Sequence, residues 1–154
     1  MKKLLLSLMF FSVNVFACTG YVIGFMGKDN VFDHRAFVEY AESSQYCHRV
    51  YPWYSTLSAQ KFISTLTIPY ELYGYSQGAA SIGIILNSQL STQPKFIITI
   101  GAYRTADVNF DKFKILYVNY FDHSGKGQTS PGIFLDVPHN KIQQEVNKIL
   151  FGKR

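Results

Sequence analysis

The 154-residue sequence is poor in several features that mark whole classes of protein. Only 16% of its residues are charged, and without Lys2 and Lys3 the net charge of +5 falls to +3. The remaining charge is dispersed and forms no basic stripe of the kind that binds nucleic acids. The two cysteines and four histidines lack zinc-ligand spacing, and Asp122 with His123 is too small a set for a metal site. Nucleic-acid binding and metal chemistry are therefore not predicted.

Long hydrophobic runs are also missing, except at the N-terminus. Residues 1–17, MKKLLLSLMFFSVNVFA, combine two lysines, an apolar stretch too short to span a bilayer comfortably, and a small residue at Ala17. This pattern predicts a signal peptide over 1–17 that is cleaved near Ala17. The mature chain, 18–154, is then expected as one domain, periplasmic or secreted, without a membrane span.

Cysteine is scarce, and its two positions leave three alternatives open: a disulfide, a lipid anchor, or simply free buried thiols. In an oxidising compartment Cys18 can form a disulfide with Cys47. Cys18 would also be the first mature residue, where a lipoprotein carries its lipid anchor. Phe16 departs from the small-residue pattern that lipidation requires, so the disulfide is the favoured reading.

Strand-like and helix-like segments alternate after the signal. We expect strands at 20–25, 46–53, 70–75, 95–102 and 114–121, and helices at 31–44, 57–66, 77–90 and 140–151. Such alternation is typical of βαβ units. It predicts an α/β fold: a single-domain three-layer sandwich with a mainly parallel sheet of about five strands. The glycine-rich stretch 122–132 is the one long loop, and such loops are often functional.

The stretch GYSQG, residues 74–78, places Ser76 between two glycines where a strand gives way to a helix. A strand, a sharp turn and a helix in that order are what lift a nucleophilic serine clear of a sheet, and the glycines avoid side-chain clashes. The helix N-terminus favours negative charge nearby. The plainer alternative is that Ser76 only caps the helix. No lysine follows as a phosphate-binding loop would require.

A nucleophilic serine needs a base, and four histidines are available. His139 lies beyond every strand and just before the last helix, where the base belongs when the chain order is serine, acid, histidine. His34 falls in a helix, and His48 falls within a strand, facing the core or a sheet surface. His123 follows a strand, but neighbouring side chains point apart, so it would not pair with Asp122. His139 is the predicted base.

Three aspartates compete for the role that orients this base. Asp122 follows the strand at 114–121 and opens the glycine-rich loop, so its carboxylate can reach across the sheet end. Asp107, in the loop after the preceding strand, is the second choice. Asp136 lies close to His139 and is better explained as a cap of the last helix.

Hydrolysis through a tetrahedral intermediate also needs hydrogen-bond donors for the developing oxyanion. One is expected from the backbone N–H of Gln77, directly after the serine. The other is expected from the loop GFMGKDN, with Phe25 preferred and Met26 second. An ordinary glycine turn is the alternative explanation for that loop.

Taken together, the strand ending in GFMG, the elbow GYSQGA, Asp122 and His139 resemble the α/β-hydrolase superfamily in kind and in order. The elbow is most similar to that of cutinases and small lipase-like esterases. The resemblance implies a minimal fold without a cap domain and a serine hydrolase acting on esters or related acyl compounds, including lipid-like ones. It implies no cofactor.

A second hypothesis comes from the shortness of the sheet. A chain of this length could be a catalytically silent, hydrolase-like domain that presents its glycine-rich loop or an aromatic patch to a protein partner or a cell-envelope polymer. The two hypotheses differ on whether Ser76 is chemically activated.

Overall fold

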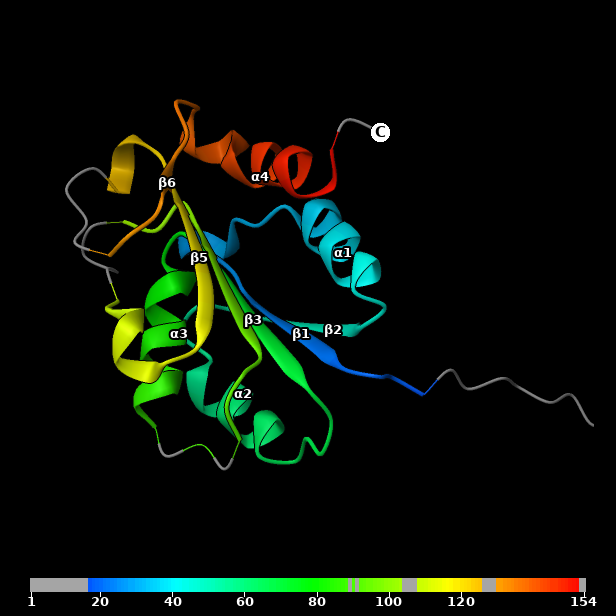
Figure 1. The fold of residues 1–154 in the computed structure, drawn as a ribbon. Helices are drawn as coiled ribbons and strands as arrows, with labels where there is room; N and C mark the ends of the chain where they lie inside the picture. The colour runs from blue at the N-terminus through cyan, green and yellow to red at the C-terminus, as the bar shows by residue number, and fades with distance from the viewer. Residues whose placement is uncertain (1–16, 89, 91, 104–107, 126–129, 153–154) are drawn as a thin grey trace, which may run out of the picture.

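A six-stranded, wholly parallel sheet forms the centre of the molecule (Figure 1). The computed structural model describes residues 17–88, 90, 92–103, 108–125 and 130–152. The strands are β1 (Tyr21–Phe25), β2 (Cys47–Tyr51), β3 (Tyr70–Tyr75), β4 (Phe96–Ile100), β5 (Leu116–Phe121) and β6 (Ile133–Phe134), in the order β2-β1-β3-β4-β5-β6. The predicted parallel sheet is confirmed, with one strand more than expected. Strand β6 has only two residues, too few to show a periodic pattern.

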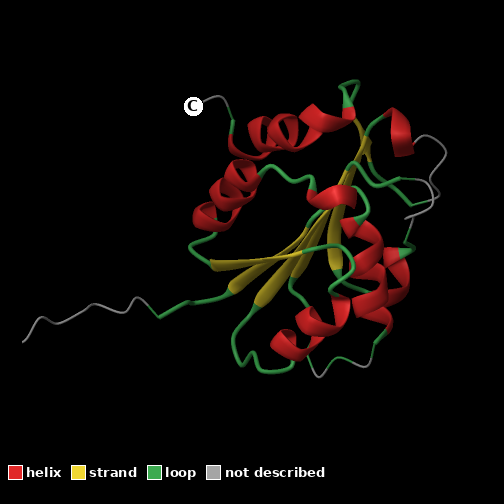
Figure 2. Ribbon diagram, turned by 180° about the vertical axis from the view of Figure 1, so that it is seen from behind, coloured by secondary structure: helices red, strands yellow, loops and turns green. Residues whose placement is uncertain are grey.

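Helices cover both faces of this sheet (Figures 1 and 2). Helices α1 (His34–Ser43) and α4 (Ile142–Phe151) pack on one face, and α2 (Thr56–Ile63) and α3 (Gly78–Asn87) pack on the other. Successive side chains of a strand point to opposite faces, so Val22 joins the α1/α4 core while Ile23 joins the α2/α3 core. The three-layer α/β sandwich is therefore confirmed. Within the described parts of the chain, no helix is long and apolar enough to cross a membrane.

Local sequence accounts for most of these elements. Strand β4 is apolar except for Thr99, as expected for a strand that is buried on both faces. Helix α1 begins where the Asp33 carboxylate accepts a hydrogen bond from Ala36 N–H at 3.0 Å, and it buries Ala36, Phe37 and Tyr40 at helical spacing. Asn147 of α4 donates to the Ala36 carbonyl at 2.7 Å, which ties the two helices of that layer together.

The order of the strands determines where a ligand can bind. From β1 the chain moves outward to β2, then returns across β1 and continues through β3, β4 and β5 in the opposite direction. The connection after β1 leads to α1 on one face, and the connection after β3 leads to α3 on the other (Figure 1). In open parallel sheets a crevice forms at the carboxyl ends of strands where the winding reverses. Here that point lies between β1 and β3.

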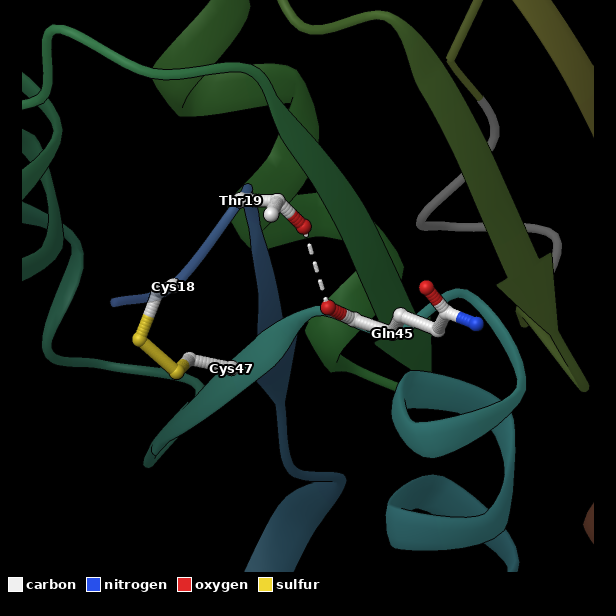
Figure 3. Close-up of a disulfide and its surroundings, with 4 residues drawn as sticks. All are labelled: Cys18, Thr19, Gln45 and Cys47. Carbon is white, nitrogen blue, oxygen red and sulfur yellow. Dashed lines mark hydrogen bonds between the residues drawn. A yellow bond between two sulfur atoms is a disulfide. The ribbon is translucent and has the colours of Figure 1, made fainter. Parts of the chain in front are cut away.

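A disulfide joins the segment before β1 to the edge strand β2 (Figure 3). Cys18 and Cys47 are bonded with their Cα atoms 5.5 Å apart. Beside them the Thr19 hydroxyl donates to the Gln45 carbonyl at 3.1 Å. A lipid thioether on Cys18 would use the same sulfur atom, so lipidation and this disulfide exclude each other. Residues 1–16 of the predicted signal peptide lie outside the described residues.

Loss of this bond should measurably weaken the fold. The disulfide closes a sequence separation of 29 residues, for which restriction of the unfolded chain predicts about 3–4 kcal/mol of stabilisation. Cys18→Ser and Cys47→Ser should therefore lower the free energy of unfolding equally in urea titrations, and reduction should reproduce both. The untreated mature protein should weigh two hydrogen atoms less than its reduced form. A heavier, acylated species would contradict the disulfide.

Candidate active site

Ser76 occupies a strained turn between β3 and α3. Its φ of 54° lies in the left-handed region, which residues other than glycine seldom adopt, and its N–H donates to the Ile100 carbonyl at 2.8 Å. The flanking glycines are required by close packing, as the sequence predicts. A Cβ at Gly74 would lie 2.7 Å from Ile82 Cδ1, and a Cβ at Gly78 would clash with the Phe25 carbonyl. The turn therefore holds Ser76 in one fixed direction at the sheet's carboxyl edge.

Three side chains distant in sequence form one continuous hydrogen-bonded chain at this edge. His139 Nε2 lies 3.0 Å from Ser76 Oγ, and His139 Nδ1 lies 2.7 Å from Asp122 Oδ2. Ser76 is 3% exposed and the Asp122 side chain 2%, whereas the His139 side chain keeps 28% of its surface exposed. The structure thus brings together the serine, histidine and aspartate singled out in the sequence, with the imidazole reachable from solvent.

The imidazole of His139 is held by aromatic rings and by backbone. Tyr75 stacks on it with ring centroids 5.2 Å apart, and the Tyr103 ring lies at 4.9 Å. The Tyr75 hydroxyl donates to the His139 carbonyl at 3.0 Å. Burial, with contributions from Asp122 and Tyr103, raises the pKa of Tyr75 to about 12, so the hydroxyl stays protonated and keeps donating. In the sequence these tyrosines resemble ordinary core residues, and only the fold places them around His139.

The Asp122 carboxylate is bound on both of its oxygens. Oδ2 faces His139, while Oδ1 accepts from the Ser124 N–H at 2.8 Å and from the Ser124 hydroxyl at 2.6 Å. Burial alone raises the pKa of Asp122, but the hydrogen bonds from Ser124 and the interactions with His139 outweigh it and lower the pKa below its usual value. Ser124 was not predicted from the sequence, although aspartate followed two residues later by serine is a common turn pattern.

This lowered pKa makes stability depend on pH. Protonation of Asp122 is easier in the unfolded chain than in the folded one, so its stabilising contribution is full above the unfolded pKa of about 4 and is lost as pH falls through the folded value. Urea unfolding between neutral pH and pH 2 should show this loss, and Asp122→Asn should flatten that part of the curve. Asp29→Asn, at an exposed residue of the 3₁₀ turn Lys28–Asn30, is a control that leaves the bonds of Asp122 intact. Equal acid sensitivity in Asp122→Asn would contradict the assignment.

The two predicted oxyanion donors are placed differently. Gln77 is the N-cap of α3, where the first backbone N–H groups of a helix have no acceptor within it. Phe25 is instead the last paired residue of β1, in register with Gly74 of β3. Because Tyr21 N–H donates toward β3 and backbone groups alternate in direction, Phe25 N–H also faces the β3 strand. Its role as an oxyanion donor stays a prediction.

The loop beyond Phe25 passes closer to the serine. Met26, the second choice, donates its N–H to the Tyr51 carbonyl at 2.9 Å and is likewise held by the sheet. Gly27 lies against the serine, because a Cβ at this position would be 3.0 Å from Ser76 Cβ. The Gly27 N–H donates to the Val31 carbonyl at 3.0 Å. The loop thus approaches the serine at Gly27.

The remaining histidines lie elsewhere. His34 is exposed in the first turn of α1, and His48 is exposed on β2. His123 points away from Asp122, as predicted for neighbours in sequence, and its Nε2 lies 2.8 Å from Asp136 Oδ1 at the surface.

Asp136 and Asp107 are the two aspartates that the sequence offers as alternatives to Asp122. The prediction that Asp136 caps the last helix is wrong: the N-cap of α4 is Lys141, and Asp136 pairs with His123 instead because the 3₁₀ turn His139–Lys141 intervenes. Asp107 lies outside the described residues. Over the part of the chain that the structure describes, no cluster of three or more histidine, cysteine, aspartate or glutamate residues could hold a metal ion.

Comparison with known proteins assigns no family to this chain. No family model matches the sequence, and no curated protein matches it. Among solved structures, the chain is similar to a protein of Pectobacterium atrosepticum described as a candidate YdeN-like hydrolase, with a TM-score of 0.49 and 11% identity. The match covers 76% of this chain and 77% of that one.

Proposed function

We propose that this protein is an exported serine hydrolase that cleaves an ester or related acyl bond. The observation that carries the proposal is the hydrogen-bonded chain from Asp122 Oδ2 through both nitrogens of His139 to Ser76 Oγ, at 2.7 and 3.0 Å. A serine is activated by a base within hydrogen-bonding reach whose other nitrogen is oriented by a third group. The strained backbone of Ser76, at the switch point of a parallel sheet, supports the same reading.

In the proposed reaction, Ser76 Oγ attacks the acyl carbon while His139 Nε2 accepts the hydroxyl proton. The bond to the leaving group then breaks, and that group departs with the proton from His139. Water, deprotonated by the same nitrogen, attacks the acyl-enzyme and releases the carboxylic acid and free Ser76. Asp122 keeps Nδ1 protonated and stabilises the imidazolium that forms in each half-reaction.

Charge on the substrate oxygen would be stabilised by backbone N–H groups. The Gln77 amide at the start of α3 is the first donor, and the helix N-terminus adds a favourable field. The second donor in this proposal is the Phe25 amide, at the end of β1 just before the glycine that lies against Ser76. A Cβ at Gly27 would crowd both Ser76 and Tyr75, so a glycine there leaves room for the reacting group.

The proposed location agrees with the disulfide. Disulfides persist in oxidising compartments, and the bond between Cys18 and Cys47 begins directly after the predicted signal peptide. Export followed by folding in a periplasm or outside the cell would produce this bond.

Reaction with a fluorophosphonate tests the proposal without knowledge of the natural substrate. Ser76 Oγ would form a bond to phosphorus, fluoride would leave, and the proton would pass to His139. Intact-mass analysis of the purified mature protein should show one adduct, which peptide mapping should locate at Ser76. Labelling should be lost in denatured protein, because the base is then no longer held beside the serine. A folded protein that forms no adduct would favour the silent binding domain.

A further inference from the structure

Ser124 makes three contacts within the candidate site, although it is none of the three residues of the hydrogen-bonded chain. Its hydroxyl donates to Asp122 Oδ1 at 2.6 Å, and its N–H donates to the same oxygen at 2.8 Å. Its Oγ also lies 3.3 Å from His139 Nδ1. One half-buried hydroxyl therefore touches both the acid and the base.

These contacts determine how the carboxylate is rotated. With both Ser124 donors on Oδ1, Oδ2 is the oxygen left to face His139, at 2.7 Å. Rotation of the carboxylate about its Cβ–Cγ bond would break two short hydrogen bonds to a buried charge. The hydroxyl thus restricts Asp122 to the orientation that holds the imidazole.

The same contacts select a tautomer of His139. Because the Ser124 hydroxyl proton is used at the closer Asp122 Oδ1, the hydroxyl oxygen faces Nδ1 as an acceptor. Nδ1 then has acceptors in both contacts, Asp122 Oδ2 and Ser124 Oγ, and must carry the proton. This leaves the lone pair of Nε2 directed at Ser76 Oγ, which is the form that a general base requires.

We propose that Ser124 is a positioning residue of this site, whose hydroxyl fixes the Asp122 carboxylate and holds His139 in the tautomer that can accept the Ser76 proton. The inference rests on the proposed hydrolase function. It also predicts that the hydroxyl can be removed without dismantling the turn, since the Ser124 N–H bond to Asp122 and the Gly125 N–H bond to the Asp122 carbonyl are both made by backbone.

The test compares the rate of fluorophosphonate labelling across pH 5–9 in four full-length proteins: unmodified, Ser124→Ala, Ser124→Thr and Ser88→Ala. Ser88 is a matched control, since its hydroxyl donates at 2.6 Å to the Ile85 carbonyl at the end of α3. Asp122, Tyr75 and Tyr103, the titratable groups that contact His139, remain in every protein. Circular dichroism establishes that each variant is folded.

Ser124→Ala should label about tenfold more slowly at neutral pH, as expected for the loss of one hydrogen bond to a charged group. Its pH midpoint should also move to lower pH, because a less well oriented Asp122 stabilises the imidazolium less. Ser124→Thr should restore the rate and the midpoint, and Ser88→Ala should change neither. A purely structural role would reduce the labelled fraction without moving the midpoint.

The outcomes separate this inference from the proposed function. If the unmodified protein labels at Ser76 and Ser124→Ala matches it in rate and midpoint, Ser124 has no positioning role and the hydrolase proposal stands. A midpoint that moves upward would also overturn the inference, since it would mean that the hydroxyl acts only by weakening the charge on Asp122. If the unmodified folded protein does not label, the proposed function itself fails.

Discussion

Replacing Ser76 by alanine should abolish fluorophosphonate labelling and lower ester hydrolysis by at least about a thousandfold. The substitution removes the atom that would form the covalent bond and the hydroxyl that donates to His139 Nε2. Folding should be retained or slightly improved, because alanine fills the same space and Ser76 N–H still donates to Ile100. Rates on short p-nitrophenyl esters and thermal melting measure the two effects.

Ser81→Ala is the matched control for Ser76→Ala. Ser81 lies in α3 and is 1% exposed, against 3% for Ser76. Its hydroxyl donates a hydrogen bond to the Trp53 carbonyl. Its loss should lower the melting temperature, because a buried acceptor loses its partner, while labelling persists. If Ser76→Ala still hydrolysed esters at the unmodified rate, Ser76 would not be the nucleophile.

Asp122→Asn should lower hydrolysis by about ten-thousandfold while the fold is maintained at neutral pH. The reason lies in the Ser124 donors. They require a carbonyl oxygen at the Oδ1 position, so the side-chain NH₂ of asparagine would face His139 Nδ1. A donor there forces Nδ1 to accept, which moves the imidazole proton to Nε2 and turns it toward Ser76. The base is then held in the wrong tautomer.

Asp136→Asn serves as the matched control for Asp122→Asn. Asp136 is also an aspartate hydrogen-bonded to a histidine, at 2.8 Å from His123 Nε2, but both side chains are largely exposed. Exposed pairs of this kind contribute little to stability, and this one is not joined to Ser76. Its substitution should leave hydrolysis unchanged. Full activity in Asp122→Asn, with the protein folded, would show that His139 needs no orienting carboxylate.

Much of the architecture could be predicted because it follows from local sequence patterns, namely hydrophobic periodicity and turn glycines. Strand β3 coincides with the predicted segment YELYGY, and α1 buries the face containing Phe37 and Tyr40. The glycines at 74 and 78 predict a tight turn, and in the structure a side chain at either position would have no space. Strand β6 was not predicted because a strand of two residues is too short to show a hydrophobic period.

Some parts of the site could not be predicted because they depend on where strand pairing and helices begin and end, rather than on residue type. The sequence predicts Phe25 to lie in a glycine-containing loop, but strand pairing with β3 extends through it, and only the fold shows this. Asp136 looked like a helix cap, yet an intervening 3₁₀ turn moves the start of α4 to Lys141. Backbone direction and the exact start of a helix are set by tertiary contacts.

The sequence by itself determined the α/β class, the order of the elements and the choice of Ser76, Asp122 and His139, because hydrophobic periods, turn glycines and chain order are local or linear properties. Only the tertiary structure decided which groups surround them. Ser124 on the carboxylate and Tyr75 and Tyr103 on the imidazole are brought there by the parallel register of β3, β4 and β5. Distances between residues far apart in the chain follow from packing, which no local pattern encodes.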